Sequence, residues 1–325
     1  MGDILKRFKN ILLVINDKVE NETAIQKSVN LSISNQAGLT VIQVLEESHN
    51  ITHFFERYSS TDVLKAHLKE KQDSLHALLA PYRKDIEIDV MVGHGKAFFE
   101  IIRAVLLHNF DLVVKACQQD GSLKTMLFGT TDMHLLRKCP CPVWLIRPQE
   151  EIKCRRILAA VDIGPSVDIE KIGALNQQIL EMATSLALSE FAELHIVHAW
   201  MIFGESLLRL SHSEQLKEEV TAWVEDQKKE IKAGHNEFKA KLDQIMGKKG
   251  SDYPHSEVHF LEGDAYEIIP RLAEEKKIDL VIMGTIARTG LPGFFMGNTA
   301  ESILNQLNCS VLAIKPEGFV SPVTI

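Results

Sequence analysis

The sequence contains neither a long apolar run nor an excess of positive charge, and both absences exclude classes of protein. No apolar run reaches the roughly 18 positions that a membrane-spanning helix needs, and the first residues lack the apolar core of a secretion signal. The 36 Lys and Arg residues are outnumbered by 44 Asp and Glu, which gives a net charge of −8. Nucleic acids and anionic membranes are captured by concentrated positive charge, so we expect a cytoplasmic protein with no direct nucleic-acid or membrane partner.

The chain also lacks a cysteine framework. Its five cysteines are an odd number without the spacing of disulfide or zinc-ligand pairs, as is typical of proteins in a reducing compartment. Cys139 and Cys141 flank a proline, but no second Cys or His pair accompanies them at a zinc spacing. His195 and His198 lie three positions apart in an expected strand, so they point to opposite faces of it. The sequence therefore predicts no metal site.

An internal repeat organises the chain. The segment Gly95-Lys-Ala-Phe-Phe-Glu-Ile-Ile-Arg is similar to Gly263-Asp-Ala-Tyr-Glu-Ile-Ile-Pro-Arg, 168 positions later. The same offset pairs Gly129 with Gly297. Upstream, the offset falls first to 155 and then to 146, so the second half carries two insertions. Such a repeat indicates a duplicated domain.

Each half is predicted to fold as five strands that alternate with helices. The 325 residues are enough for two domains, which we expect at residues 1–149 and 150–325. Short runs of Val, Ile and Leu are typical of parallel strands buried on both faces. Alternating strands and helices indicate right-handed crossovers, so the expected class is α/β, with two tandem doubly wound parallel-sheet domains. The expected strands are 11–15, 39–44, 88–92, 112–115 and 143–146, with counterparts at 157–161, 194–199, 258–261, 280–283 and 311–314.

The carboxyl ends of the first and fourth strands of the second half carry residues suited to a ligand site. In a doubly wound sheet, ligands bind where the strand order reverses. The fourth strand leads to Gly284, and a loop then reaches Gly297 before a helix that is expected to begin at Ala300. Asn298 or Thr299 is expected to cap this helix. Glycines and a helix start expose N–H groups to an anion such as a phosphate.

These residues resemble the signature of the universal stress proteins. In nucleotide-binding members, the pattern Gly-x-x-Gly, nine residues, Gly-Ser/Thr binds the phosphates of ATP, and Gly284 and Gly297 match its first and third glycines. Two positions depart, since Ala287 replaces the second glycine and Asn298 replaces the Ser/Thr. The family's first strand ends in an aspartate that meets the adenosine, here Asp162. The resemblance implies that ATP or a related nucleotide binds at Asp162, Met283, Gly284, Ala287, Gly297, Asn298 and Thr299.

The first half has lost most of this signature. At the offset of 168, Ala116 replaces the first glycine and Gln119 the second, while Asn16 stands at the aspartate position. We therefore expect the first half not to bind ATP in the family manner. Its expected role is structural, packed against the second half as in a dimer of single-domain members. This intramolecular pseudo-dimer leaves both a monomer and a further homodimer open.

The resemblance is closest to the tandem members of the E type. It rests on the segment from Thr131 to Trp144 in the first half and on residues 284–290 and 297–301 in the second. Members of this type are associated with cytoplasmic stress resistance, including survival of DNA damage. The resemblance implies that role for this chain.

The longer insertion leaves a second hypothesis open. Residues 200–203 extend the second strand, and a long helix at 214–246 has apolar positions that include Val220 and Val224. These residues could form ordinary packing, or an apolar groove for a lipid-like ligand that residues 294–296 help to line. The protein would then be a binding protein or scaffold without ATP. No nucleophile elbow or Ser/His/Asp order appears, so no catalytic residue is expected, and slow ATP hydrolysis is the weakest alternative.

Overall fold

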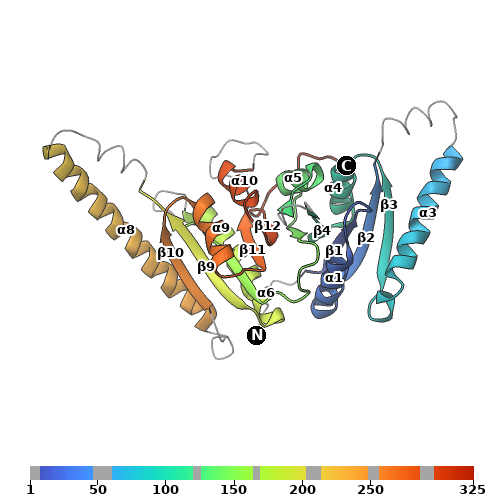
Figure 1. Cartoon of the computed structure of the whole chain (residues 1–325), viewed down its shortest axis with the longest axis horizontal. Coiled ribbons are helices and arrows are strands. Elements are labelled where there is room, and N and C mark those ends of the chain that lie inside the picture. The colour runs from blue at the N-terminus through green and yellow to red at the C-terminus, as the bar shows by residue number, and fades with distance from the viewer. Residues whose placement is uncertain are drawn as a thin grey trace.

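A single ten-stranded sheet runs through the molecule (Figure 1). The computed structural model describes residues 8–46, 61–119, 126–163, 169–202, 214–247, 256–285 and 296–325. The strand order is β10-β9-β8-β11-β12-β7-β4-β1-β2-β3. Neighbouring strands are parallel except β7 and β12, which pair antiparallel at the centre. Two doubly wound, five-stranded parallel sheets therefore meet edge to edge, which confirms the expected fold class.

All ten expected strands are present. They consist largely of Val, Ile and Leu, because helices cover both faces of the sheet. A small antiparallel hairpin of β5 (Gln118–Gln119) and β6 (Met126–Leu127) lies outside the main sheet. The strands are β1 (Asn10–Ile15), β2 (Gly38–Leu45), β3 (Ile88–His94), β4 (Leu112–Ala116), β7 (Val143–Ile146), β8 (Arg156–Ala160), β9 (Glu193–Trp200), β10 (Ser256–Glu262), β11 (Leu280–Gly284) and β12 (Ser310–Ile314).

The helices form one layer on each face of the sheet. One layer contains α1 (Glu22–Asn35), α3 (Thr61–Leu79), α6 (Ile169–Glu190) and α8 (Glu214–Gly247), whose buried side chains share a core. The other contains α4 (Ala97–His108), α5 (Thr130–Lys138), α9 (Ala265–Glu275) and α10 (Asn298–Leu304). A short 3-10 turn covers Tyr82–Lys84. Helices α3 and α8 lie at opposite ends of the molecule in Figure 1.

The duplication is visible in the burial of the helices. The buried positions of α1, from Ala24 to Ser32, recur in α6 at an offset of 155, from Ile179 to Ala187. The backbone repeats too, since Gly95 and Gly263 have φ of 134° and 140°. The insertion after β8 therefore lengthens the start of α6, because the second part of the helix keeps the packing of α1.

The two halves share both cores and several polar contacts. Each core contains residues of both halves, such as Leu13 and Ile157 on one face. The polar segment after Pro148, where the sequence predicts the linker, is packed into this interface. The Glu150 side chain is 12% exposed, pairs with Lys27 at 3.1 Å and accepts a 2.6 Å hydrogen bond from the Ser310 hydroxyl. The halves are therefore held together by packed and paired side chains as well as by β7 and β12.

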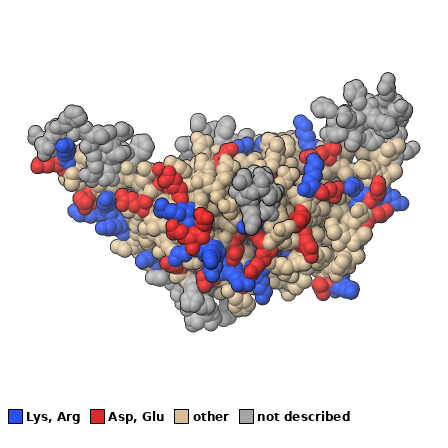
Figure 2. Space-filling view, viewed as in Figure 1, with Lys and Arg blue, Asp and Glu red and all other residues tan. Residues whose placement is uncertain are grey.

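The described surface agrees with the charge pattern of the sequence. On the face in Figure 2, acidic and basic side chains are interspersed rather than separated into patches. None of the helices in the described part of the chain is long and apolar enough to cross a membrane. Mixed charge of this kind is typical of solvated helix faces.

Candidate functional site

The reversal of strand order in the second half lies between β8 and β11. These strands run side by side, with Ala160 opposite Met283. Asp162 follows β8, and its main chain is held by Asn176 of α6, whose side chain accepts from the Asp162 N–H at 3.0 Å and donates to its carbonyl at 2.6 Å. Gly284 ends β11 at the neighbouring position. The structure thus brings Asp162 and Gly284, which are far apart in sequence, to one edge of the sheet.

Gly284 is closely packed against α6. A Cβ atom built at this position would lie 2.8 Å from Cδ2 of Leu175. This is closer than real Cβ contacts come, so a larger residue would displace the leucine side chain. Close packing against Leu175 therefore explains a glycine at this position, in addition to the ligand role that the sequence suggests. Met283 is buried in the core on the α9 and α10 face.

The start of α10 differs from the sequence prediction. Gly297 is the N-cap, with φ −63° and ψ 138°, and the helix begins at Asn298 rather than at Ala300. The prediction that Asn298 or Thr299 caps the helix is wrong, because both residues are already helical and their side chains are exposed. The Gly297 N–H donates to the Thr285 carbonyl at 3.2 Å, which closes the connecting loop at its base. Ala287 and the rest of that loop lie outside the described residues.

A buried lysine that the sequence analysis missed lies beside this loop. Lys315, directly after β12, donates hydrogen bonds to the Thr285 hydroxyl and the Leu136 carbonyl. Burial lowers the pKa of Lys315 to about 8. The repeat gave a weak signal, since the offset of 168 pairs Lys315 with Arg147, and a cation therefore follows the fifth strand in both halves.

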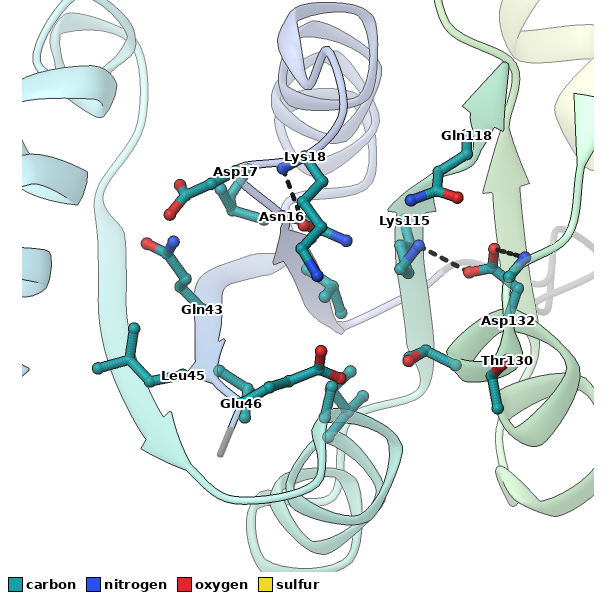
Figure 3. Close-up of a pocket in the computed structure, with 17 residues that line it drawn as sticks. Asn16, Asp17, Lys18, Gln43, Leu45, Glu46, Lys115, Gln118, Thr130 and Asp132 are labelled. Atoms are coloured by element: carbon teal, nitrogen blue, oxygen red, sulfur yellow. Dashed lines mark hydrogen bonds and ion pairs between the residues drawn. The ribbon is translucent and has the colours of Figure 1, made fainter. Parts of the chain in front are cut away.

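The first half contains a cavity of about 650 Å³ at the equivalent position (Figure 3). It lies at the carboxyl ends of β1 and β4, where the strand order reverses. Its polar wall includes Asn16, Asp17, Lys18 and Gln43. The first half therefore has a cavity at this position even though it has lost the signature glycines.

A buried ion pair lies in the wall of this cavity, at the start of α5. Lys115 Nζ lies 2.7 Å from Oδ1 of Asp132, and their side chains are 5% and 1% exposed. The other carboxylate oxygen, Oδ2, accepts a 2.9 Å hydrogen bond from the Gly129 N–H at the start of α5. An internal carboxylate therefore stands where the signature would place a phosphate. At the offset of 168, the second half has Met283 and Ala300 at these two positions, so it lacks the pair.

The comparisons with known proteins fit this architecture. The model of the universal stress protein family matches residues 7–147 and 154–315. The chain belongs to this family. It is similar to universal stress protein E of Escherichia coli K12, at 28% identity over 98% of this chain and 97% of the relative. It is also 30% identical to a universal stress protein E homolog of Haemophilus influenzae, over 95% and 98%. The chain is thus a tandem universal stress protein of the E type.

A solved structure extends the comparison to the fold. A putative universal stress protein from Pseudomonas aeruginosa superposes with a TM-score of 0.67 and 24% identity, over 95% of this chain and 94% of that one. At this identity the likeness concerns the fold. It agrees with two universal stress protein domains that share one continuous sheet.

The apolar positions of the insertion pack inside this universal stress protein fold. Ile202, Val220 and Val224 are buried against one another, with Trp200 and Ile231 beside them. The expectation that residues 294–296 help to line a groove here is wrong for Met296, which is buried in the core of the opposite layer. Residues 294 and 295 and the part of the insertion from 203 to 213 lie outside the described residues. Val220 and Val224 therefore form ordinary packing, whereas Trp223 of the same helix is 42% exposed.

Proposed function

We propose that the second domain binds ATP or a related nucleotide as a regulatory ligand, at the carboxyl ends of β8 and β11. One observation carries the proposal: Asp162 and Gly284 lie at the ends of adjacent strands, and the Gly297 N–H is bonded to Thr285 at the same edge. The residues that match the family signature therefore converge from three segments of the chain. This is the position at which doubly wound sheets bind ligands.

The first domain is proposed to be the structural partner. The Gly129 N–H already donates a 2.9 Å hydrogen bond to the Asp132 carboxylate. A phosphate here would be repelled by this carboxylate, because like charges repel strongly when they are buried. A phosphate would have to displace this carboxylate from both Gly129 and Lys115. The second domain lacks this carboxylate, because Ala300 stands at the position of Asp132.

The proposal is tested by the small molecules that the purified protein carries. Wild type and two variants, Asp162→Ala and the matched first-domain change Asn16→Ala, are denatured, and the released compounds are counted by mass spectrometry. We expect about one nucleotide per chain from wild type and from Asn16→Ala. Loss of one charge-assisted hydrogen bond, about 1.5–3 kcal/mol, weakens binding roughly ten- to a hundredfold, so Asp162→Ala should release far less.

Two outcomes would contradict the proposal. If Asn16→Ala loses the nucleotide and Asp162→Ala keeps it, the ligand binds in the first domain. If no variant carries nucleotide and added ATP does not bind in calorimetry, the signature has no nucleotide function here. An apolar compound released instead would favour the binding-protein alternative. Release of ADP together with metal-dependent phosphate production would make the domain a slow ATPase rather than a regulatory site.

The family also supports a proposal about the cellular role. We propose that the protein acts in the cytoplasm in stress resistance, including survival of DNA damage, and that the domain boundary lies between residues 149 and 150. Cells that lack the gene should be more sensitive to ultraviolet light. Wild type should restore survival, and Asp162→Ala should restore it less if the nucleotide regulates the protein. Equal rescue by both would separate the stress role from the nucleotide site.

A further inference from the structure

Three side chains of types that can ligate a metal converge on the α9 face of the second domain, at the end of the sheet remote from the proposed nucleotide site. Glu257 of β10 lies directly opposite His195 of β9 in the strand register. His259 is two residues further along β10 and therefore points to the same face as Glu257. The two imidazole rings are stacked, with centroids 5.4 Å apart and an angle of 23° between their planes.

The separations of the three possible ligand atoms match a metal site. His195 Nδ1 lies 3.1 Å from His259 Nε2, while Oε2 of Glu257 lies 3.4 Å from the first nitrogen and 3.7 Å from the second. Zinc binds nitrogen at about 2.0–2.1 Å and carboxylate oxygen at about 2.0–2.2 Å in a tetrahedron, so its ligand atoms stand roughly 3.4 Å apart. A single ion at about 2.1 Å can reach all three atoms with little movement.

The surroundings of the cluster suit an ion with one open position. The His195 and His259 side chains are largely buried, whereas that of Glu257 is 54% exposed. The carboxylate thus opens the cluster to solvent, from which an ion and a water ligand can enter. On the far side of His195, Glu193 Oε2 lies 3.9 Å from Nε2. At this distance the carboxylate does not hydrogen-bond to the imidazole, and the same Oε2 accepts a 3.2 Å hydrogen bond from Arg156.

The cluster also has a metal-free explanation. Lys276 Nζ lies 2.8 Å from Glu257 Oε2, and the two imidazoles can share one hydrogen bond. The lysine pair is at the surface, where such pairs contribute about 0–1 kcal/mol, so the lysine can move away at small cost. The shared hydrogen bond does not by itself account for the carboxylate oxygen, which lies within 3.7 Å of both nitrogens.

A comparison with the first domain shows that the fold does not require these three residues. In the same register, the first domain has Thr40 opposite Asp89, with Met91 at the position of His259. Both imidazoles are therefore particular to the second domain, and neither is needed to build this pair of strands. We propose that His195, Glu257 and His259 bind one zinc ion, with water as the fourth ligand, and that the ion fastens the edge strand β10 to β9.

The test is zinc binding to the untagged full chain after chelator treatment, in competition with a chromophoric indicator. Wild type should bind one zinc per chain. His195→Thr and His259→Met, which introduce the residues of the first domain, should each weaken binding by at least tenfold. His198→Gln is the matched control, because His198 lies on the same strand but on its opposite face, and it should bind as wild type does.

A variant that is expected to bind zinc more tightly is also needed, because misfolding can weaken binding but does not strengthen it. Lys276→Ala removes the cation that competes for Glu257 Oε2, so it should bind zinc several-fold more tightly than wild type. Zinc should also raise the melting temperature of wild type but not that of His259→Met. Wild type without a stoichiometric site would overturn the proposal, and so would equal affinity in wild type, His195→Thr, His259→Met and Lys276→Ala.

Discussion

At the scale of single residues, the two domains differ clearly where Lys115 and Asp132 meet. Their ion pair is buried, with 2.7 Å between Nζ and Oδ1. The sequence carried a signal for it that our prediction did not use: both charges occur together in the first domain and are both replaced, by Met283 and Ala300, in the second. Paired replacement between duplicated domains is therefore a useful guide to buried contacts.

The energetic role of this pair can be tested with residues that the chain itself supplies. Asp132→Ala leaves the Lys115 ammonium buried without its partner, which should lower the free energy of unfolding by about 3–5 kcal/mol. The double variant Lys115→Met and Asp132→Ala recreates the pair of the second domain. It should recover most of the loss, apart from about 1 kcal/mol for the missing cap of α5. Urea unfolding measures both values, and a double variant as unstable as the single one would show that the pair is not what stabilises this site.

His198 makes the stability depend on pH. Burial, and to a smaller degree the neighbouring His235, lower its pKa from 6.5 to about 4, against a backbone contact with Val161 that raises it. The unfolded state therefore takes up a proton as the pH falls below 6.5, whereas the folded state does not until about pH 4. The stability associated with the neutral ring is complete above pH 6.5 and is lost between these values, by about 3 kcal/mol in total.

Replacing His198 by glutamine should flatten this profile, since Gln43 occupies the equivalent position in the first domain. Between pH 7.5 and 4.5, the free energy of unfolding of wild type should fall by about 2–3 kcal/mol more than that of His198→Gln. Urea unfolding at several pH values gives both curves. His235 remains in both proteins, so its own titration cancels in the comparison. Parallel curves would contradict the assignment to His198.

At the scale of helices and strands, the sequence predicted which elements are present better than it predicted where they end or which residues of neighbouring strands meet. All ten strands were predicted because strands buried on both faces consist of apolar runs. The start of α10 was misplaced because two good capping residues, Asn298 and Thr299, directly follow the glycine that caps it. The meeting of His195 with His259 was missed because it depends on the register of β9 and β10, and apolar runs do not determine register.

The end of α6 carries a strained residue that can be relieved. Phe191 has φ of 56° and is 94% exposed, and the left-handed region costs an L-residue about 1–2 kcal/mol. Phe191→Gly should therefore raise the free energy of unfolding by about 1 kcal/mol, because glycine is the preferred residue at this position after a helix. Phe191→Ala keeps the backbone strain and removes the ring, so it serves as the control. Equal urea midpoints for Gly and Ala would show that the backbone is not strained here.

At the scale of the whole molecule, the duplicated domains are joined into one sheet. The pairing of β7 and β12 makes the sheet continuous, and both apolar cores cross this junction. On the outer face, Arg137 donates to both carboxylate oxygens of Glu301 at 2.9 Å. The sequence predicted that the domains pack together, but not this edge-to-edge pairing. Strand β7 of the first half and strand β12 of the second are largely apolar, as the other strands are, so their sequences do not show that they pair with each other.

Because the sheet is continuous, a destabilising substitution at one end of it should also lower the stability of the other end. Leu75 of α3 is 2% exposed and lies in the core at the β3 end of the sheet. Leu75→Ala should lower the free energy of unfolding by about 2–5 kcal/mol. Hydrogen exchange of the slowest amides should report the same decrease in β9 of the second domain as in β2 of the first, because such amides exchange through global unfolding. The exposed change Glu70→Ala on the same helix should alter neither strand. A decrease confined to β2 would mean that the two domains unfold independently, and the shared sheet would then join them without making them cooperate.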